Sequence, residues 1–222
     1  MLPDLPQTEA AIVDMTNSFR KASTLQEMKP NAVLAAAARA FAEYLARTGK
    51  FAHEADGRKP EDRAEAQGYR YCLVAENLAW NLNSRGFESR QLAHEVVEGW
   101  KTSPGHRANL LLSGATEIGV AVVRVPNKNP KFVSVQMFGR PDSLKVTFSI
   151  QNQSGKAVYY GLGGETDLLN PRETVTHTDC DLSRLSIDKA GGARAQFNPR
   201  NGDRFVIQRN PAGGVEVKVE RK

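Results

Sequence analysis

The sequence has few cysteines and no long apolar run. Its 222 residues include only 2 cysteines, which cannot form a framework of several disulfide bonds. No stretch approaches the ~18 consecutive apolar residues of a membrane-spanning helix. Residues 1–6 have neither the cationic nor the apolar region of an export signal. We therefore expect no membrane span, in either a cytosolic protein or a mature secreted one.

Several catalytic motifs are also missing. No Gly-x-Ser-x-Gly or Gly-x-x-x-x-Gly-Lys sequence occurs, which argues against an α/β-hydrolase and against a P-loop nucleotide-binding protein. Residues 53–57 begin like the helix motif of zinc proteases, but Gly57 stands where the second histidine is needed. The sequence therefore contains no motif that requires an enzymatic function.

Clustered basic residues are a further absence. The formal net charge is +5, but the lysines and arginines occur singly or in pairs near acidic residues. Nucleic-acid binding normally needs a basic stripe or patch. We expect no nucleic-acid partner.

The first part of the chain has helical periodicity from Thr8 to about Lys101. One expected helix lies between Asn31, a typical N-cap, and Gly49, a typical stop signal. A short helix is expected to begin at Pro60 and another at Ser89. One further helix is expected before Asn31, and apolar residues recur at three- and four-residue spacing in three of these segments. These apolar positions are Ile12, Met15 and Phe19, then Leu34, Ala38, Phe41 and Leu45, then Leu92, Val96 and Trp100.

Strands are expected after Gly114. Residues 117–125 and 131–138 are rich in Val and are separated by a turn-like segment with two prolines, which predicts an antiparallel pair. Helices followed by strands predict an α+β domain that spans residues 1–140.

The remainder, residues 141–222, shows a different pattern. Short alternating runs are separated by turn signals such as residues 201–203 and 211–214, and 9 of the 18 glycines lie here. This composition predicts a small all-β, sandwich-like domain of unknown role. The alternating runs are residues 145–150, 157–160, 204–207 and 215–219.

Two of the four histidines lie in loops that can direct a side chain into a cleft. His53 follows an expected helix, and His106 follows a Pro-Gly turn. Between them, Glu76 lies in an apolar run, where a carboxylate is costly to bury without a donor, a cation or a metal ion. His94 and His177 are expected on the surface.

The cysteines and tryptophans allow several interpretations. Cys72 has apolar neighbours, which favours an inert buried thiol over a nucleophile. Cys72 and Cys180 are either free thiols or a bridge between the two domains, and the sequence does not decide between these alternatives. Trp80 and Trp100 are expected in the core.

Five segments taken together resemble the bacterial branch of the CAP superfamily, which contains cysteine-rich secretory proteins, antigen 5 proteins and pathogenesis-related proteins. The resemblance covers about residues 8–140 and leaves the β-rich part uncovered. Its segments are residues 51–53 (Phe-Ala-His), 75–80 (Ala-Glu-Asn-Leu-Ala-Trp), 100–110 (Trp-Lys-Thr-Ser-Pro-Gly-His-Arg-Ala-Asn-Leu), 117–120 and 133–139.

The resemblance implies an α-β-α sandwich with a central cleft, in a secreted or periplasmic protein. It places His53, Glu76 and His106 in that cleft. Where members often have a second glutamate, this chain has Ser103. Two imidazoles, from His53 and His106, with one carboxylate form a partial coordination shell for a divalent metal such as Zn²⁺, and they equally form a hydrogen-bonded polar cluster.

Three functions follow as hypotheses. The first is a non-enzymatic domain whose cleft binds a divalent metal, a small lipid-like ligand or a protein partner. The second is a metal-dependent peptidase or esterase with His53 and His106 as ligands and Glu76 as base. The third is a structural module of the cell envelope. The ligand, the metal and the oligomeric state do not follow from the sequence.

Overall fold

The structure, a computed structural model, describes residues 1–180, 184–188 and 194–221. The chain divides into two compact units, Met1–Ser143 and Leu144–Lys222, and the short 3-10 helix η1 (Asp142–Leu144) spans the division. The expected boundary at residue 140 lies near the end of the last strand of the first unit. Each unit has its own apolar core.

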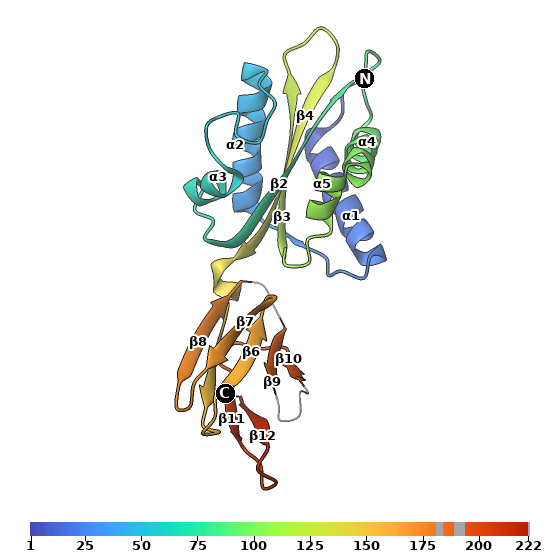
Figure 1. Cartoon of the computed structure of the whole chain (residues 1–222). Helices are drawn as coiled ribbons and strands as arrows, with labels where there is room; N and C mark the ends of the chain where they lie inside the picture. The colour runs from blue at the N-terminus through green and yellow to red at the C-terminus, as the bar shows by residue number, and fades with distance from the viewer. Residues whose placement is uncertain (181–183, 189–193, 222) are drawn as a thin grey trace. The chain divides into compact units, whose positions relative to one another are not determined.

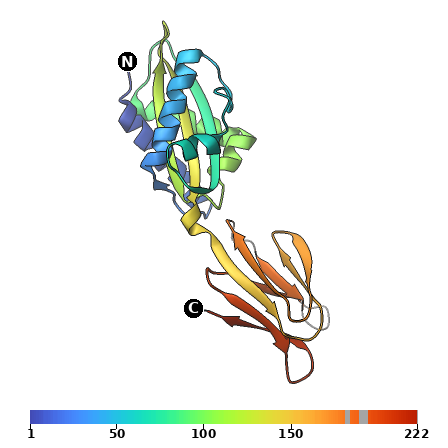
Figure 2. The same cartoon turned by 90° about the vertical axis from the view of Figure 1, so that its left-hand side faces the viewer.

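The first unit is a four-stranded sheet with helices on both faces (Figures 1 and 2). Helices α2 and α3 cover one face, and α1, α4 and α5 cover the other. The predicted α-β-α sandwich is therefore confirmed. In chain order the elements are α1 (Leu5–Ala22), β1 (Lys29–Pro30), α2 (Ala32–Thr48), α3 (Pro60–Ala66), β2 (Tyr71–Leu82), α4 (Ser89–Thr102), α5 (Pro104–Leu110), β3 (Glu117–Val125) and β4 (Lys131–Pro141).

Helix α2 begins and ends at the predicted capping residues, Asn31 and Gly49. The Asn31 side chain accepts hydrogen bonds from the backbone N–H groups of Val33 and Leu34, at 2.9 and 3.1 Å. Gly49 adopts a left-handed conformation with φ of 71°, which a residue without Cβ accommodates without strain. Both expectations are confirmed, and together they fix where the loop carrying His53 leaves the helix.

Strand β2 was not expected. Residues 71–82 lie inside the segment whose pattern is helical, but they pair along their length with β4 at the edge of the sheet. The apolar run from Tyr71 to Ala75 is compatible with either structure, and tertiary pairing decides it. Because side chains alternate along a strand, β2 places Glu76 and Asn77 on opposite faces of the sheet.

Strands β3 and β4 form the predicted antiparallel pair, with Glu117 opposite Gly139 and Val125 opposite Lys131. The sheet order is β1-β3-β4-β2, so these two strands lie at its centre. Close packing fixes α2 against this sheet, because a Cβ on Gly119 would lie 2.2 Å from the backbone N of Ala35.

The second unit consists of two four-stranded sheets, ordered β10-β9-β6-β7 and β12-β11-β5-β8, around one apolar core. The predicted all-β domain is therefore present, and its fold class is confirmed. The four expected runs correspond to β5, β6, β11 and β12. The strands are β5 (Val146–Asn152), β6 (Val158–Leu162), β7 (Glu165–Leu169), β8 (Thr174–Asp179), β9 (Leu185–Asp188), β10 (Arg194–Phe197), β11 (Arg204–Arg209) and β12 (Val215–Glu220).

Two expectations for individual residues need correction. Neither Cys72 nor Cys180 is a free thiol. The interpretations of Cys72 as an inert buried thiol or as a nucleophile are therefore wrong. His177 is half-buried rather than on the surface, because its Nε2 lies 3.1 Å from the Tyr160 hydroxyl and its ring packs 5.5 Å from that of Phe148. His94 is exposed, as predicted. Within the described residues, no helix has both the length and the apolar character needed to cross a membrane.

Candidate functional site

His53 and Glu76 lie side by side, although 23 positions separate them. The His53 Nδ1 atom is 2.9 Å from Glu76 Oε1. His53 lies in the turn after α2, and half of its side chain is exposed, whereas the Glu76 side chain on β2 is fully buried. The contact therefore joins an accessible imidazole to an inaccessible carboxylate.

Arg63 is the main partner of Glu76, and the sequence did not identify it. Its Nη2 atom contacts both carboxylate oxygens, at 2.9 and 3.1 Å. Its Nη1 atom donates to Asp56 Oδ1 at 2.8 Å, and its guanidinium lies over the Phe41 ring, 3.6 Å from the centroid. The cost of burying Glu76 is thus offset by a cation, which was one of the alternatives that the sequence left open.

Helix α3 positions Arg63. It begins at Pro60, and the Lys59 backbone N–H donates to the Asp62 carboxylate at 3.0 Å, which fixes the first turn. Arg63 then projects beneath the loop that carries His53, where its Nη2 also donates to the His53 carbonyl oxygen at 2.8 Å. One arginine therefore fixes both the loop backbone and the Glu76 carboxylate.

His106 belongs to α5, which begins immediately after Ser103. A polar network ties this helix to the sheet: Asn77 Nδ2 donates to the His106 carbonyl oxygen at 3.2 Å, and Asn109 Nδ2 donates to Asn77 Oδ1 at 3.0 Å. Asn109 also donates to the Glu76 carbonyl oxygen at 3.0 Å. The backbone of β2 beside Glu76 is thereby fixed to α5.

Burial lowers the pKa of His106 below 6.5, and the charge of His53 lowers it further. The two imidazoles therefore lie within electrostatic range of each other, and the His106 ring is neutral at neutral pH. A neutral imidazole can accept a hydrogen bond or bind a metal ion.

Beside His106 is a groove of about 300 Å³ between β2 and the α4–α5 region. His106 and Ser103 line it, and Phe51 and Trp80 contribute aromatic rings. Trp80 was expected in the core, but its side chain is 54% exposed, with the Lys131 ammonium 4.8 Å from its ring centroid. Trp100 is buried, as predicted.

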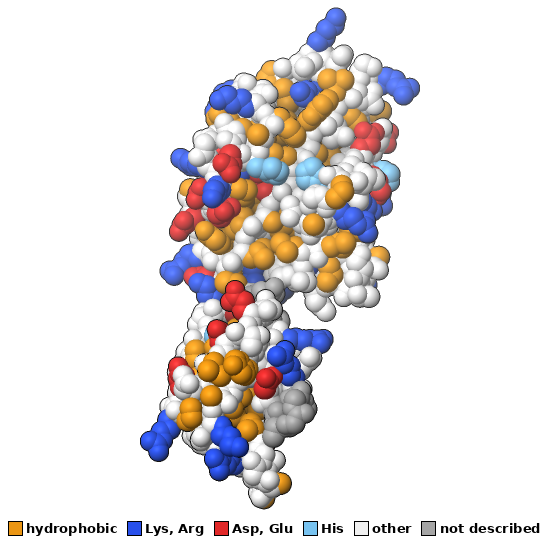
Figure 3. Space-filling model, viewed as in Figure 1, with side chains coloured by type: hydrophobic (Ala, Val, Ile, Leu, Met, Phe, Trp, Pro, Cys, Tyr) orange, Lys and Arg blue, Asp and Glu red, His pale blue; other side chains and the backbone are white. Residues whose placement is uncertain are grey.

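The surface view shows the same region. Histidine side chains gather across the middle of one face of the first unit, with hydrophobic side chains around them (Figure 3). Of the candidate residues, His106 and Ser103 line the groove, whereas His53 and Glu76 are not among its lining residues. The structure thus brings together two pairs, His53 with Glu76 and His106 with Ser103.

A metal centre with three or more protein ligands does not fit this arrangement. Within the described residues, no group of three or more His, Cys, Asp or Glu side chains is placed to hold an ion. Both Glu76 oxygens contact Arg63, and Ser103 has no carboxylate. The donors left for a metal are the imidazoles of His53 and His106.

The family model described as CAP, cysteine-rich secretory protein family, matches residues 13–138, which is more than half of the chain. The sequence is also similar to the uncharacterized protein YkwD of Bacillus subtilis (strain 168), with 29% identity over 116 residues. That match covers 52% of this chain and 42% of YkwD, so the chain spans less than half of this relative's length.

Two solved structures share the fold. An outer surface protein from Borrelia burgdorferi has a TM-score of 0.52 at 21% identity, covering 60% of this chain and 92% of its own. An extracellular protein containing a SCP domain from Bacillus anthracis has a TM-score of 0.50 at 25% identity, covering 61% of this chain and 41% of its own. Both alignments cover about the length of the first unit.

Proposed function

The chain belongs to the cysteine-rich secretory protein family, and on that premise we propose that its first unit is a non-catalytic binding domain of an exported bacterial protein. Secretion or a periplasmic location is supported by the extracellular and outer-surface descriptions of the two structural relatives. The groove beside His106 is the binding site in this proposal.

The observation that carries the proposal is the contact of Arg63 with both oxygens of Glu76. A general base must offer a free lone pair within reach of the proton that it removes. The Glu76 carboxylate is fully buried and already accepts from Arg63 and His53, so it acts as a structural anchor instead. This supports binding over metal-assisted hydrolysis with Glu76 as base.

The groove has the composition of a protein-binding surface. Exposed aromatic side chains give much of the energy of protein recognition, and Trp80 and Phe51 supply two of them. The rest of the lining includes polar groups, among them those of Asn81, Glu95 and Ser103. A bound acyl chain would bury these groups without giving them hydrogen-bond partners, which is unfavourable. A protein partner with an apolar anchor therefore fits better than a small lipid-like ligand.

A divalent metal at His53 and His106 is the second candidate, favoured by the depressed pKa of His106 and by its electrostatic proximity to His53. Two imidazoles hold an ion weakly unless water or a partner completes its coordination. Calorimetric titration of chelator-treated protein with Zn²⁺ tests this. Binding that His53→Ala and His106→Ala abolish supports the metal site, and unchanged binding in both variants excludes it.

The binding groove is tested by nuclear magnetic resonance with small fragments on the full chain. The chain has two tryptophans, and both line the groove. The Trp100 side chain is buried and its indole donates to the Leu78 carbonyl oxygen at 3.0 Å, so the exposed Trp80 indole is the more direct reporter of binding. We expect aromatic and apolar peptide fragments to shift the Trp80 indole and His106 signals. Trp80→Ala should abolish this binding.

Two results would contradict the proposal. One is fragment binding that leaves the Trp80 and His106 signals unchanged. The other is turnover of ester or peptide substrates that Glu76→Gln abolishes while the protein stays folded. If the protein were instead a structural module of the cell envelope, removal of residues 144–222 would abolish its localisation, and Trp80→Ala would leave its localisation unchanged.

A further inference from the structure

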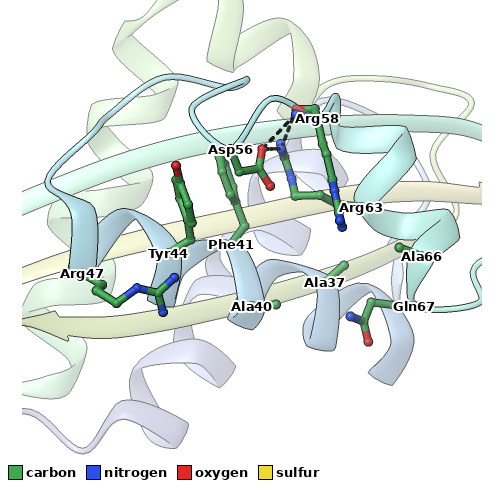
Figure 4. A pocket seen from close by; sticks show the side chains of 10 residues that line it. All are labelled: Ala37, Ala40, Phe41, Tyr44, Arg47, Asp56, Arg58, Arg63, Ala66 and Gln67. Atoms are coloured by element: carbon green, nitrogen blue, oxygen red, sulfur yellow. Dashed lines mark hydrogen bonds and ion pairs between the residues drawn. The ribbon is translucent and has the colours of Figure 1, made fainter.

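A second pocket lies between α2 and α3, and Arg63 is one of the residues that line it (Figure 4). Its volume is about 340 Å³, within the range of small-ligand sites. It is separate from the groove beside His106, because the two have no lining residue in common. Three of its lining residues, Phe41, Asp56 and Arg63, also take part in the contacts around Glu76 described above.

Positive charge predominates in the lining of this pocket. Arg47, Arg58 and Arg63 contribute three guanidinium groups, and Asp56 contributes one carboxylate. Figure 4 shows Arg47 and Arg58 on opposite sides of the pocket, with Phe41 and Tyr44 between them. Because Asp56 is already held by Arg63, the charges of the two outer arginines favour an anionic ligand.

One donor of the lining residue Arg63 is unpartnered among the described residues. The two terminal nitrogens of Arg63 are fully engaged, with Asp56, Glu76 and backbone carbonyl oxygens. Its Nε is buried and has no acceptor among the described residues. A buried N–H group without an acceptor is uncommon in folded proteins, and a water molecule, an ion or a ligand can supply one.

The uncharged lining narrows the class of ligand. Ala37, Ala40 and Ala66 give small apolar walls, which leave room for methyl-sized groups. The Gln67 amide can both donate and accept, as the peptide bond of a ligand requires. Guanidinium groups bind carboxylates in a matching two-pronged geometry.

We propose that the pocket between α2 and α3 binds the carboxyl end of a short acyl peptide with small side chains. The carboxylate pairs with the guanidinium group of Arg58, the guanidinium group of Arg47 across the pocket adds positive charge, and the small side chains lie against the alanines. Capture of a terminal carboxylate in a preformed polar pocket is an established mode of peptide recognition. This site would function whether or not the groove beside His106 binds a partner.

The test uses N-acetyl-alanyl-alanine and its C-terminal amide, which differ only in the charged end. Each is titrated into the full-length protein while the arginine Nε–H signals are observed by nuclear magnetic resonance. We expect the acid to shift the signals of Arg47, Arg58 and Arg63 and to bind at least about tenfold more tightly than the amide.

Two variants and a control locate the site. Arg58→Gln and Arg47→Gln remove exposed side chains, so both should fold. Arg58→Gln should weaken binding of the acid about tenfold, and Arg47→Gln, which removes a charge from the opposite side of the pocket, should weaken it less. Arg90→Gln removes an equivalent exposed charge from α4 and should leave binding unchanged. The groove experiments above use different variants, so the two proposals fail separately.

Three outcomes would overturn the inference. Equal binding of the acid and the amide would remove the role of the carboxylate. Binding that survives both Arg47→Gln and Arg58→Gln would place the site elsewhere. Inorganic phosphate binding as tightly as the acid would mean that the pocket is a general anion site without peptide recognition.

Discussion

Arg63 holds Glu76 by both carboxylate oxygens in the interior of the first unit, with N–O distances of 2.9 and 3.1 Å. Both side chains are almost inaccessible, at 5% and 0% exposed. The pair connects helix α3 to strand β2, while the same arginine binds the carbonyl oxygen of His53. The most chemically suggestive acid in the sequence therefore has a structural partner, and the accessible group beside it is the imidazole of His53.

The pKa of His106 gives a prediction for pH dependence. Burial and then the charge of His53 lower it below 6.5 in the folded protein, so the unfolded chain binds more protons at this residue. This residue's contribution to stability is therefore full above pH 6.5 and is lost as the pH falls below it. Titration of the histidine ring signals should show His106 titrating below 6.5.

His53→Ala supplies the control for that titration. It removes the charge that lowers the pKa of His106, so the pKa should move up toward 6.5 but remain depressed by burial. His94→Ala removes an exposed histidine from α4 and should leave the signal of His106 at its original pKa. A His106 pKa at or above 6.5 in the unaltered protein would contradict the burial of the ring.

The two tryptophans should differ in their contribution to stability. Trp100 is 1% exposed and its indole N–H is hydrogen-bonded to the Leu78 carbonyl oxygen, so Trp100→Ala should cost about 3–5 kcal/mol of unfolding free energy. Trp80 is 54% exposed, and Trp80→Ala should change stability by less than about 1 kcal/mol.

Urea denaturation of the two tryptophan variants measures this difference. An acrylamide quenching experiment on the Trp100→Phe variant should also show strong quenching, since Trp80 is then the sole tryptophan that fluoresces. Similar losses of stability in the two alanine variants would mean that Trp80 is packed in the core, as the sequence had predicted.

Asn77 should be required for the attachment of α5. Its side chain is fully buried and connects His106, Asn109 and Gln136. Asn77→Ala removes these three hydrogen bonds and should cost about 1–3 kcal/mol, with faster amide exchange in α5. Asn83→Ala, in the loop after β2, is a suitable control and should leave α5 unaffected. Unchanged exchange in α5 on loss of Asn77 would refute its role.

The sequence predicted those parts of the fold that depend on local signals. Asn31 and Gly49 mark the ends of α2 because caps act within one helical turn. The turn between β3 and β4 and the change from helices to strands were also found. Strand β2 was missed because its identity depends on pairing with β4, which lies well beyond it in the chain.

The candidate site was predictable only in part. An isolated Glu76 in an apolar run indicated a buried carboxylate, and the structure has one. Its partner could not be identified, because the choice among many arginines depends on how α3 packs against β2. The exposure of Trp80 does not follow from strand alternation, because Glu76 and Leu78 lie on the same face of β2 and are buried. It depends on how much of the strand the neighbouring elements cover, which the sequence does not show.

The central claim is that Glu76 serves as the structural partner of Arg63. A double-mutant cycle of Arg63→Met and Glu76→Gln, measured by urea denaturation, tests it most directly. We predict that each single variant loses about 3–5 kcal/mol, because each removes one member of a buried ion pair, and that the double variant loses less than the sum. Additive losses would mean that the two residues act independently, and that Glu76 is available for another role.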